Sequence, residues 1–95
     1  MDIVILGAGK IGTGIATNLV KQNYNITVVD LNAEKLQTLQ SDFDLATVIG
    51  SASSPEILTK AGIKKDTIVL AVTNSDESNL IACQLCKNLF SVNRT

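Results

Sequence analysis

Four short runs of apolar residues divide the chain, and none of them alternates with polar positions. They are Ile3–Leu6, Ile26–Val29, Leu45–Ile49 and Thr67–Val72. An apolar run without alternation is typical of a strand that is covered on both faces, as in a parallel sheet flanked by helices. The pattern therefore predicts four buried, parallel strands.

The segments between these runs carry helical patterns. The first helix is predicted to begin in the glycine-rich segment after the first run and to end near Asn23, and the second begins at Asn32. A short third helix ends at Gly62. The fourth extends from about Asp76 to Phe90 and has apolar residues around most of its circumference, so we expect it to be buried more fully than the others.

Strands and helices that alternate in this way predict one α/β domain of the Rossmann type. Right-handed crossovers give a doubly wound parallel sheet with the strand order 3-2-1-4. The carboxyl ends of all four strands then meet at one rim of the sheet. Ligands of open α/β sheets bind at this rim, between the first and fourth strands.

The rim segment after the first strand has the sequence of a dinucleotide-binding loop, Gly7-Ala8-Gly9-Lys10-Ile11-Gly12. Gly7 would permit a tight turn, Gly9 the close approach of a pyrophosphate, and Gly12 tight packing of the helix on the sheet. Asp30 ends the second strand, eighteen residues after Gly12. Its carboxylate is placed to accept hydrogen bonds from an adenosine ribose.

The first helix differs from the other three at its start. The later helices carry acids in their first turns, whereas the first offers only glycines and Lys10. Its N–H groups and positive dipole end therefore suit an external anion. Alternatively, water solvates these groups and the glycines serve only a tight turn. Lys10 is expected either to pair with a phosphate or to remain solvated.

Two further loops reach the same rim. Leu31 follows Asp30, and Ser51 and Ala52 lie in a loop without bulky side chains, where a flat base has room. This loop is alternatively an ordinary turn that ends in an N-cap at Ser54. Thr73 and Asn74 follow the fourth strand, where they are placed to contact the rest of a nucleotide or to cap the next helix, with Asn74 and Glu77 spaced as in a capping box.

The chemistry of these residues favours particular ligands. A carboxylate at Asp30 would repel the 2′-phosphate of NADP, and no arginine follows it to compensate. NAD(H) or an adenine nucleotide such as ATP or ADP is therefore expected, and the sequence does not separate the two. The chain has no histidine and no evident catalytic cluster. A nucleotide without a reactive partner indicates sensing, and we expect no enzyme activity.

Composition excludes several other classes of protein. The chain has 95 residues, a net charge of −1 and 3% aromatic residues, which argues against a nucleic-acid partner. No apolar run approaches the roughly 20 residues that cross a bilayer, and the first strand starts too early to leave room for a signal peptide. A cytoplasmic domain is expected. Cys83 and Cys86 lack the two further ligands of a zinc site and are expected to be core thiols.

The whole chain, residues 1–95, resembles the N-terminal nucleotide-binding domain of Trk-type potassium uptake regulators, in the RCK/KTN family. The resemblance rests on the glycine loop, on the segment that ends in Asp30, on Phe43-Asp44-Leu45 and above all on residues 71–84. The last stretch, which begins Ala71-Val72-Thr73-Asn74-Ser75-Asp76-Glu77, is not shared by generic dehydrogenases.

This resemblance implies a cytoplasmic regulator, peripheral to the inner face of the cell membrane. It would bind NAD(H) or ATP/ADP and gate a membrane potassium transporter through homodimers or tetramers. The glycine loop would contact the phosphates, Asp30 the ribose and Ser51 the adenine, although many relatives carry aspartate in place of Ser51. The family's domain continues into a fifth strand, so the chain is expected to be a truncated form or a fragment whose fourth strand has an open edge.

Two other functions remain open at this point. The chain is alternatively the cofactor-binding half of an NAD-dependent oxidoreductase, or an assembly domain with an empty site. Hydride transfer would favour the first alternative, and the lack of any stabilisation by nucleotides would favour the second.

Overall fold

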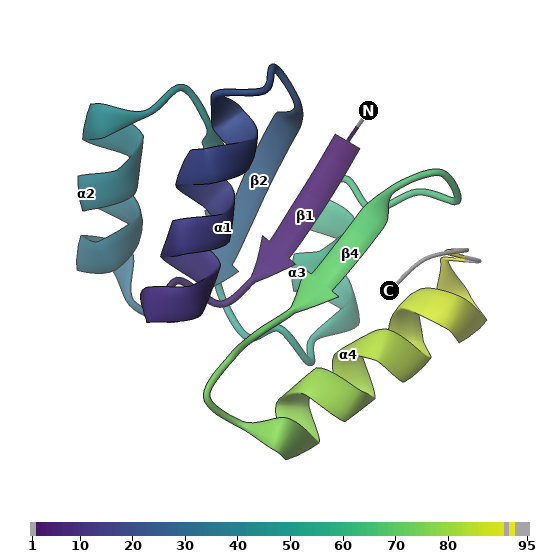
Figure 1. The fold of residues 1–95 in the computed structure, drawn as a ribbon. Coiled ribbons are helices and arrows are strands. Elements are labelled where there is room, and N and C mark those ends of the chain that lie inside the picture. Colours follow the sequence, from purple (N-terminus) through teal and green to yellow (C-terminus); the bar gives the residue numbers. More distant parts are fainter. Residues whose placement is uncertain (1, 91, 93–95) are drawn as a thin grey trace.

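The fold follows the predicted alternation of strands and helices (Figure 1). A computed structural model describes residues 2–90 and 92. The eight elements, in chain order, are β1 (Asp2–Leu6), α1 (Lys10–Val20), β2 (Asn25–Asp30), α2 (Ala33–Asp42), β3 (Ala46–Ile49), α3 (Pro55–Lys60), β4 (Ile68–Ala71) and α4 (Asp76–Leu89).

The four strands form one parallel sheet in the order β3-β2-β1-β4, as predicted. β1 pairs with β2 from Asp2↔Asn25 to Leu6↔Val29, and with β4 from Ile3↔Ile68 to Leu6↔Ala71. Because all strands run the same way, their carboxyl ends share one rim, to which the arrowheads of β1 and β4 point in Figure 1. Among the described strands, β3 and β4 form the two edges.

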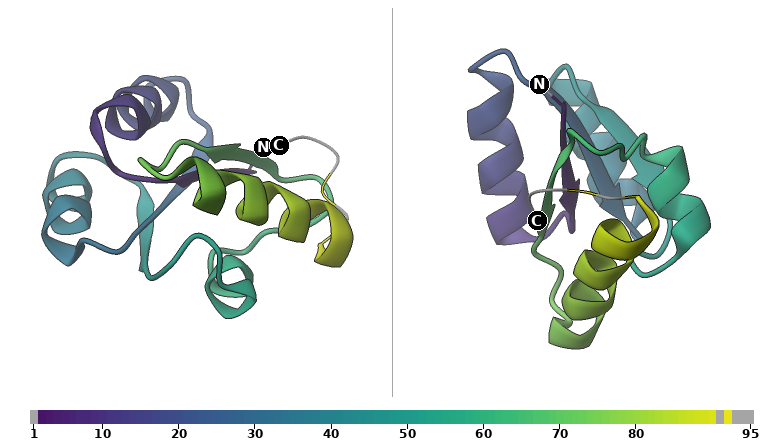
Figure 2. Two further views of the ribbon diagram at one scale, coloured as in Figure 1. Left: turned by 90° about the horizontal axis from the view of Figure 1, so that it is seen from below. Right: turned by 90° about the vertical axis from the view of Figure 1, so that its right-hand side faces the viewer.

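Helices cover both faces of the sheet (Figure 2). Successive residues of a strand point to opposite faces, so Ile3 and Ile5 of β1 pack on the side of α1 and α2, whereas Val4 and Leu6 pack on the side of α3 and α4. Both faces of β1 are therefore buried in separate apolar clusters. This arrangement explains why its sequence shows no polar alternation.

The boundaries of several elements differ from the sequence-based expectation. Leu45, Thr67 and Val72 lie outside the strands, and α1 ends at Val20. Asn23 has a φ of 67° in the turn that follows. These shifts of one to three residues change neither the order of the elements nor the rim.

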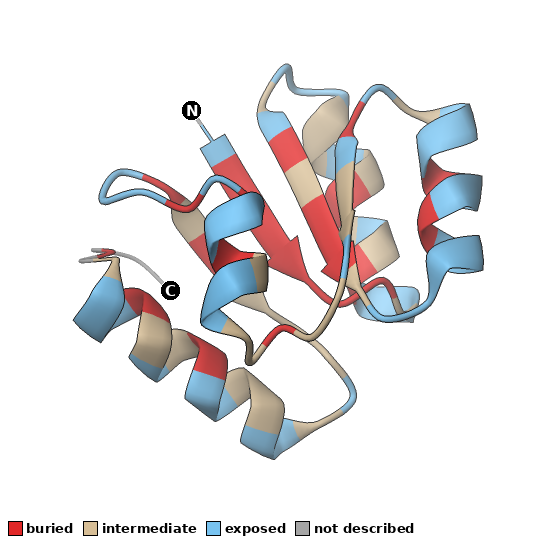
Figure 3. Ribbon diagram, turned by 180° about the vertical axis from the view of Figure 1, so that it is seen from behind, coloured by how far each residue is buried: buried red, intermediate tan, exposed pale blue. Residues whose placement is uncertain are grey.

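The expectation that α4 is the most buried helix is wrong. Only Ala82 and Cys86 of this helix are buried, whereas Leu80, Ile81 and Leu89 are 61%, 37% and 60% exposed. The reason is its position: α4 covers the edge strand β4, and no described element lies on its outer flank (Figures 1 and 3). Its apolar sequence alone does not show how many neighbours the helix has.

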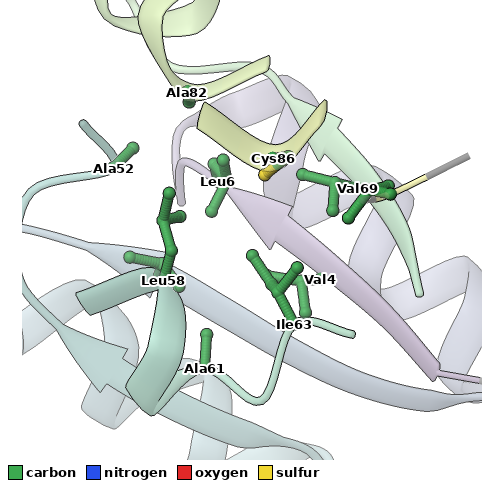
Figure 4. Close-up of a cluster of buried hydrophobic side chains, with 11 residues drawn as sticks. Val4, Leu6, Ala52, Leu58, Ala61, Ile63, Val69, Ala82 and Cys86 are labelled. Carbon is green, nitrogen blue, oxygen red and sulfur yellow. The ribbon is translucent and has the colours of Figure 1, made fainter. Parts of the chain in front are cut away.

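The two cysteines have different environments. Cys86 is fully buried beside Leu6 and Val69 in the cluster below α4 (Figure 4), and Cys83 is half-buried. Both thiols are free. Within the described part of the chain, no three His, Cys, Asp or Glu residues lie close enough to hold a metal ion.

Burial of Cys86 predicts a base-sensitive fold. Desolvation, together with the nearby Cys83, raises the pKa of the Cys86 thiol from 9.0 to about 11. The thiol ionises at lower pH in the unfolded chain than in the folded one. The free energy of unfolding is therefore unaffected by this group below pH 9 and falls as the pH rises from 9 to 11. The loss is expected to be roughly 2–3 kcal/mol. Denaturant unfolding at pH 7, 9 and 11 measures it.

Cys86→Ala and Cys83→Ala provide the comparison for this measurement. Cys86→Ala is expected to lose less stability between pH 9 and 11 than the unsubstituted chain, because it has no thiol to ionise. Cys83→Ala should retain most of the pH-dependent loss. Parallel curves for the unsubstituted chain and Cys86→Ala would contradict the prediction.

Candidate functional site

A cavity of about 420 Å³ opens at the rim where the carboxyl ends of the strands meet. It lies over the point at which the chain reverses its progress through the sheet, between β1 and β4. Of the residues that the sequence predicted for the site, those that line the cavity are Gly7, Ala8, Gly9, Lys10, Ile11, Asp30, Leu31, Ser51, Ala52, Thr73 and Asn74. Gly12 lies outside the lining.

The glycine loop has the geometry that its sequence predicted. Gly7 adopts a φ of +121°, which L side chains rarely adopt, and a Cβ there would lie 2.8 Å from the backbone oxygen of Val72. A Cβ on Gly12 would collide with the backbone oxygen of Gly7. Gly12 therefore acts from beneath the site, where it lets α1 pack directly on the turn.

Gly9 is the member of the loop that faces open space. A Cβ built on it would meet no atom within 4 Å, although Gly9 lines the cavity. The lack of a side chain at this position is therefore not required by protein packing. It leaves the backbone accessible to a molecule in the cavity.

The start of α1 differs from the starts of α2 and α4 in its capping. Gly9 occupies the N-cap position of α1 without a side-chain hydrogen bond, and the first turn has no acid. In α2 and α4, Asn32 and Ser75 accept hydrogen bonds from the backbone N–H groups of Lys35 and Ser78. The positive end of α1 therefore faces the cavity without an acidic neighbour on its own first turn, which suits an anion.

Three charged residues line the cavity, and two of them are cationic. Lys10 is the first residue of α1. Lys35 lies in the first turn of α2 and follows Asp30 in the sequence. The sequence analysis missed Lys35 because the residue lies within the expected helix rather than in a loop. Together the two lysines make the cavity lining net positive.

Asp30 has a structural role that the sequence did not show. Its Oδ2 accepts a hydrogen bond of 2.9 Å from the backbone N–H of Ala8, and its Oδ1 accepts one of 3.0 Å from that of Asn32. The carboxylate therefore joins the glycine loop to the loop that starts α2. An ionised carboxylate has about four acceptor positions, so its predicted role at a ribose stays compatible with both bonds.

Part of the cavity lining is both apolar and exposed. Ile11 and Leu31 are 68% and 73% exposed, although both are large hydrophobic residues. The neighbouring loop presents Ser51, whose hydroxyl pairs with that of Ser53 at 2.9 Å. Ala52 belongs to the core cluster as well as to the cavity wall. Ser54 occupies the N-cap position of α3 but makes no capping hydrogen bond through its side chain.

The loop between β4 and α4 closes the cavity on the opposite side. The alternative of a capping box between Asn74 and Glu77 is wrong, because Ser75 caps α4 and accepts the N–H of Ser78 at 3.2 Å. Asn74 is exposed on the rim. Besides Lys35, the lining residues outside the predicted site set are Val29, Gly50, Val72, Ser75 and Ser78, and of these Gly50, Val72 and Ser75 belong to the loops that the sequence placed at the rim.

A parallel sheet in the order 3-2-1-4, with this cavity at its rim, defines a domain of the Rossmann type. Solved structures share the fold. The Kef C-terminal domain of Shewanella denitrificans, in its AMP-bound form, superposes with a TM-score of 0.83 at 20% identity over 96% of this chain and 54% of its own. ChuY, an anaerobillin reductase of Escherichia coli O157:H7, gives 0.79 at 11% identity over 97% of this chain and 47% of its own.

The chain belongs to the TrkA-N domain family, whose model matches residues 3–95. Among curated relatives, the Trk system potassium uptake protein TrkA is 48% identical in Vibrio alginolyticus and 50% identical in Haemophilus influenzae, in each case over 91 residues. These alignments cover 96% of this chain. The chain spans only 20% of the length of either relative.

No helix in residues 2–90 or at 92 is both long and apolar enough to span a bilayer.

Proposed function

We propose that this chain is the nucleotide-sensing module of a potassium uptake system. The observation that carries the proposal is the cavity in which the uncapped start of α1, the open backbone at Gly9, the carboxylate of Asp30 and two lysines converge. Anions bind where unpaired N–H groups and a positive helix end face a cavity without an acidic cap. Relatives named for potassium uptake support the biological role.

The proposed ligand is NAD(H) or an adenine nucleotide such as ATP or ADP. Its phosphates would lie against residues 7–12, with Lys10 beside them, and its ribose would contact Asp30. Leu31, Ser51 and Ala52 would flank the adenine, and Thr73 and Asn74 the rest of the molecule. The AMP named in the Kef structure supports an adenine nucleotide on this fold. The volume of the cavity lies within the range of small-molecule sites.

The proposed action is regulatory rather than catalytic. The titratable side chains among the lining residues are Lys10, Asp30 and Lys35, and we assign them to binding. In the complete protein, the module would lie in the cytoplasm, peripheral to the inner face of the membrane. Assembled as a dimer or tetramer, it would transmit its occupancy to a membrane potassium transporter.

Thermal unfolding in the presence of nucleotides tests the proposal. A ligand at a hundred times its Kd stabilises the folded state by about 2.7 kcal/mol. For a domain of this size the midpoint should rise by roughly 10 °C or more. We expect such shifts with NAD⁺, NADH, ATP or ADP, and a small shift with NADPH because its 2′-phosphate would face Asp30.

Two variants distinguish the site from general effects of charge. Asp30→Asn keeps the size of the side chain but removes the charge and one acceptor, so it should abolish most of the shift. Asp66→Asn, in an exposed turn at the opposite end of β4, should leave the shift unchanged. Equal shifts with NADH and NADPH would refute the role of Asp30, and the absence of any shift would refute nucleotide binding.

A further inference from the structure

Asn79 bonds to a residue of the cavity wall without lining the cavity itself. Its Oδ1 accepts hydrogen bonds from the backbone N–H and the hydroxyl of Thr73, at 3.0 and 2.6 Å. Its Nδ2 donates to the backbone oxygen of Thr73 at 3.1 Å. Three hydrogen bonds therefore join one side chain of α4 to one residue of the rim.

The hydrogen bonds to Asn79 begin where the backbone pairing between the strands ends. The backbone N–H of Val72 donates to the oxygen of Leu6 at 2.9 Å. One residue later, the N–H and the C=O of Thr73 both bond to Asn79 instead of to a strand. An amide side chain offers an acceptor and a donor on two neighbouring atoms, as a peptide group does. Asn79 thus replaces a strand partner for the first residue of the loop.

Thr73 in turn bonds to the next part of the loop. The hydroxyl of Thr73, whose single proton is donated to Asn79, accepts a hydrogen bond from the backbone N–H of Ser75 at 3.2 Å. Both Thr73 and Ser75 line the cavity. The Asn79 amide therefore holds in place the residue around which this wall of the cavity turns.

We propose that Asn79 is a positioning residue for the nucleotide site, acting through Thr73 and not through the ligand. This inference rests on the proposed function. A loop already held in its binding geometry loses less conformational freedom when a ligand arrives, and affinity increases accordingly. Removing the Asn79 amide should therefore weaken binding although no ligand contact is deleted.

The test compares the affinity for ADP of the unsubstituted chain and of Asn79→Ala, at a temperature where both are folded. We expect the Kd to rise about tenfold, since a factor of ten corresponds to about one net hydrogen bond. Amide hydrogen exchange supplies a specific signature. The Thr73 amide should exchange faster in the variant, whereas that of Val72, bonded to Leu6, should remain protected.

Thr67→Val is the matched control. The Thr67 hydroxyl is buried and accepts the backbone N–H of Lys64 at 2.9 Å, at the end of β4 away from the cavity. Its loss should lower stability without changing the affinity for ADP or the exchange of Thr73. An equal loss of affinity in Thr67→Val would overturn the proposal, since destabilisation alone would then account for it.

Asn79→Asp serves if Asn79→Ala does not fold. The aspartate keeps acceptors for the N–H and the hydroxyl of Thr73, but it places an oxygen where Nδ2 met the Thr73 carbonyl. We expect weaker binding of ADP and a smaller increase in Thr73 exchange. A folded variant at Asn79 that binds ADP as tightly as the unsubstituted chain sinks the proposal. If the unsubstituted chain itself binds no nucleotide, the proposed function fails instead.

Discussion

Gly12→Ala is expected to lower the free energy of unfolding by about 3 kcal/mol, the upper part of the range for overpacking. The added Cβ would collide with the backbone oxygen of Gly7, and a backbone atom cannot swing away as the end of a flexible side chain can. α1 would have to lift from the turn after β1. Since a domain of this size has a total stability on the order of 10 kcal/mol, the midpoint of thermal unfolding should fall by roughly 15 °C or more.

Gly14→Ala is the control for this measurement. Gly14 lies in the same helix, is exposed, and has open space where a Cβ would be built. An alanine there should stabilise the helix by about 0.5–1 kcal/mol, because alanine loses less backbone entropy than glycine. Similar, small effects at both positions would show that α1 does not pack on Gly7 as described.

Gly9→Val is expected to have the opposite profile, with a large loss of binding and little loss of stability. A Cβ on Gly9 meets no atom within 4 Å, so the new side chain starts in open space. It would instead project into the cavity and keep phosphates from the backbone N–H groups. The loss of two charge-assisted hydrogen bonds corresponds to at least a hundredfold rise in Kd.

Calorimetric titration with ADP and with NADH measures this loss, and the free energy of unfolding should fall by about 1 kcal/mol, as for a poorer N-cap residue. Gly14→Ala again controls for a substitution in the same segment, and it should bind both nucleotides normally. Unchanged affinity in Gly9→Val would mean that phosphates do not bind at this loop. Gly9 and Gly12 would then differ only in how closely protein atoms pack around them.

Much of this structure could be predicted because its determinants are local in the sequence. The apolar runs give the strands, and their continuity shows that helices cover both faces. Once the strands are parallel, the handedness of crossovers orders the sheet and brings the ends of its strands to one rim. Candidate residues as distant as Gly9, Asp30 and Thr73 therefore line one cavity. Their proposed contacts with a nucleotide remain predictions.

The errors of the sequence analysis concern interactions between segments. The burial of α4 depends on how many elements surround β4, and the apolar pattern of the helix does not contain that number. Ser75, rather than Asn74, caps α4 because the path of the loop after β4 decides which side chain reaches the first N–H groups. Hydrogen bonds between Thr73 and Asn79 join this loop to α4.

The sequence by itself determined the order and type of the elements, the parallel sheet and the rim at which its candidate residues gather, because periodicity and chain chirality act over short distances. Only the tertiary structure decided which polar groups meet there: Asp30 with the N–H of Ala8, Asn79 with Thr73, and Lys35 with the cavity. Whether a hydrogen bond forms depends on differences of a few tenths of an ångström in the distance between segments that pack independently. No spacing along the chain specifies those distances.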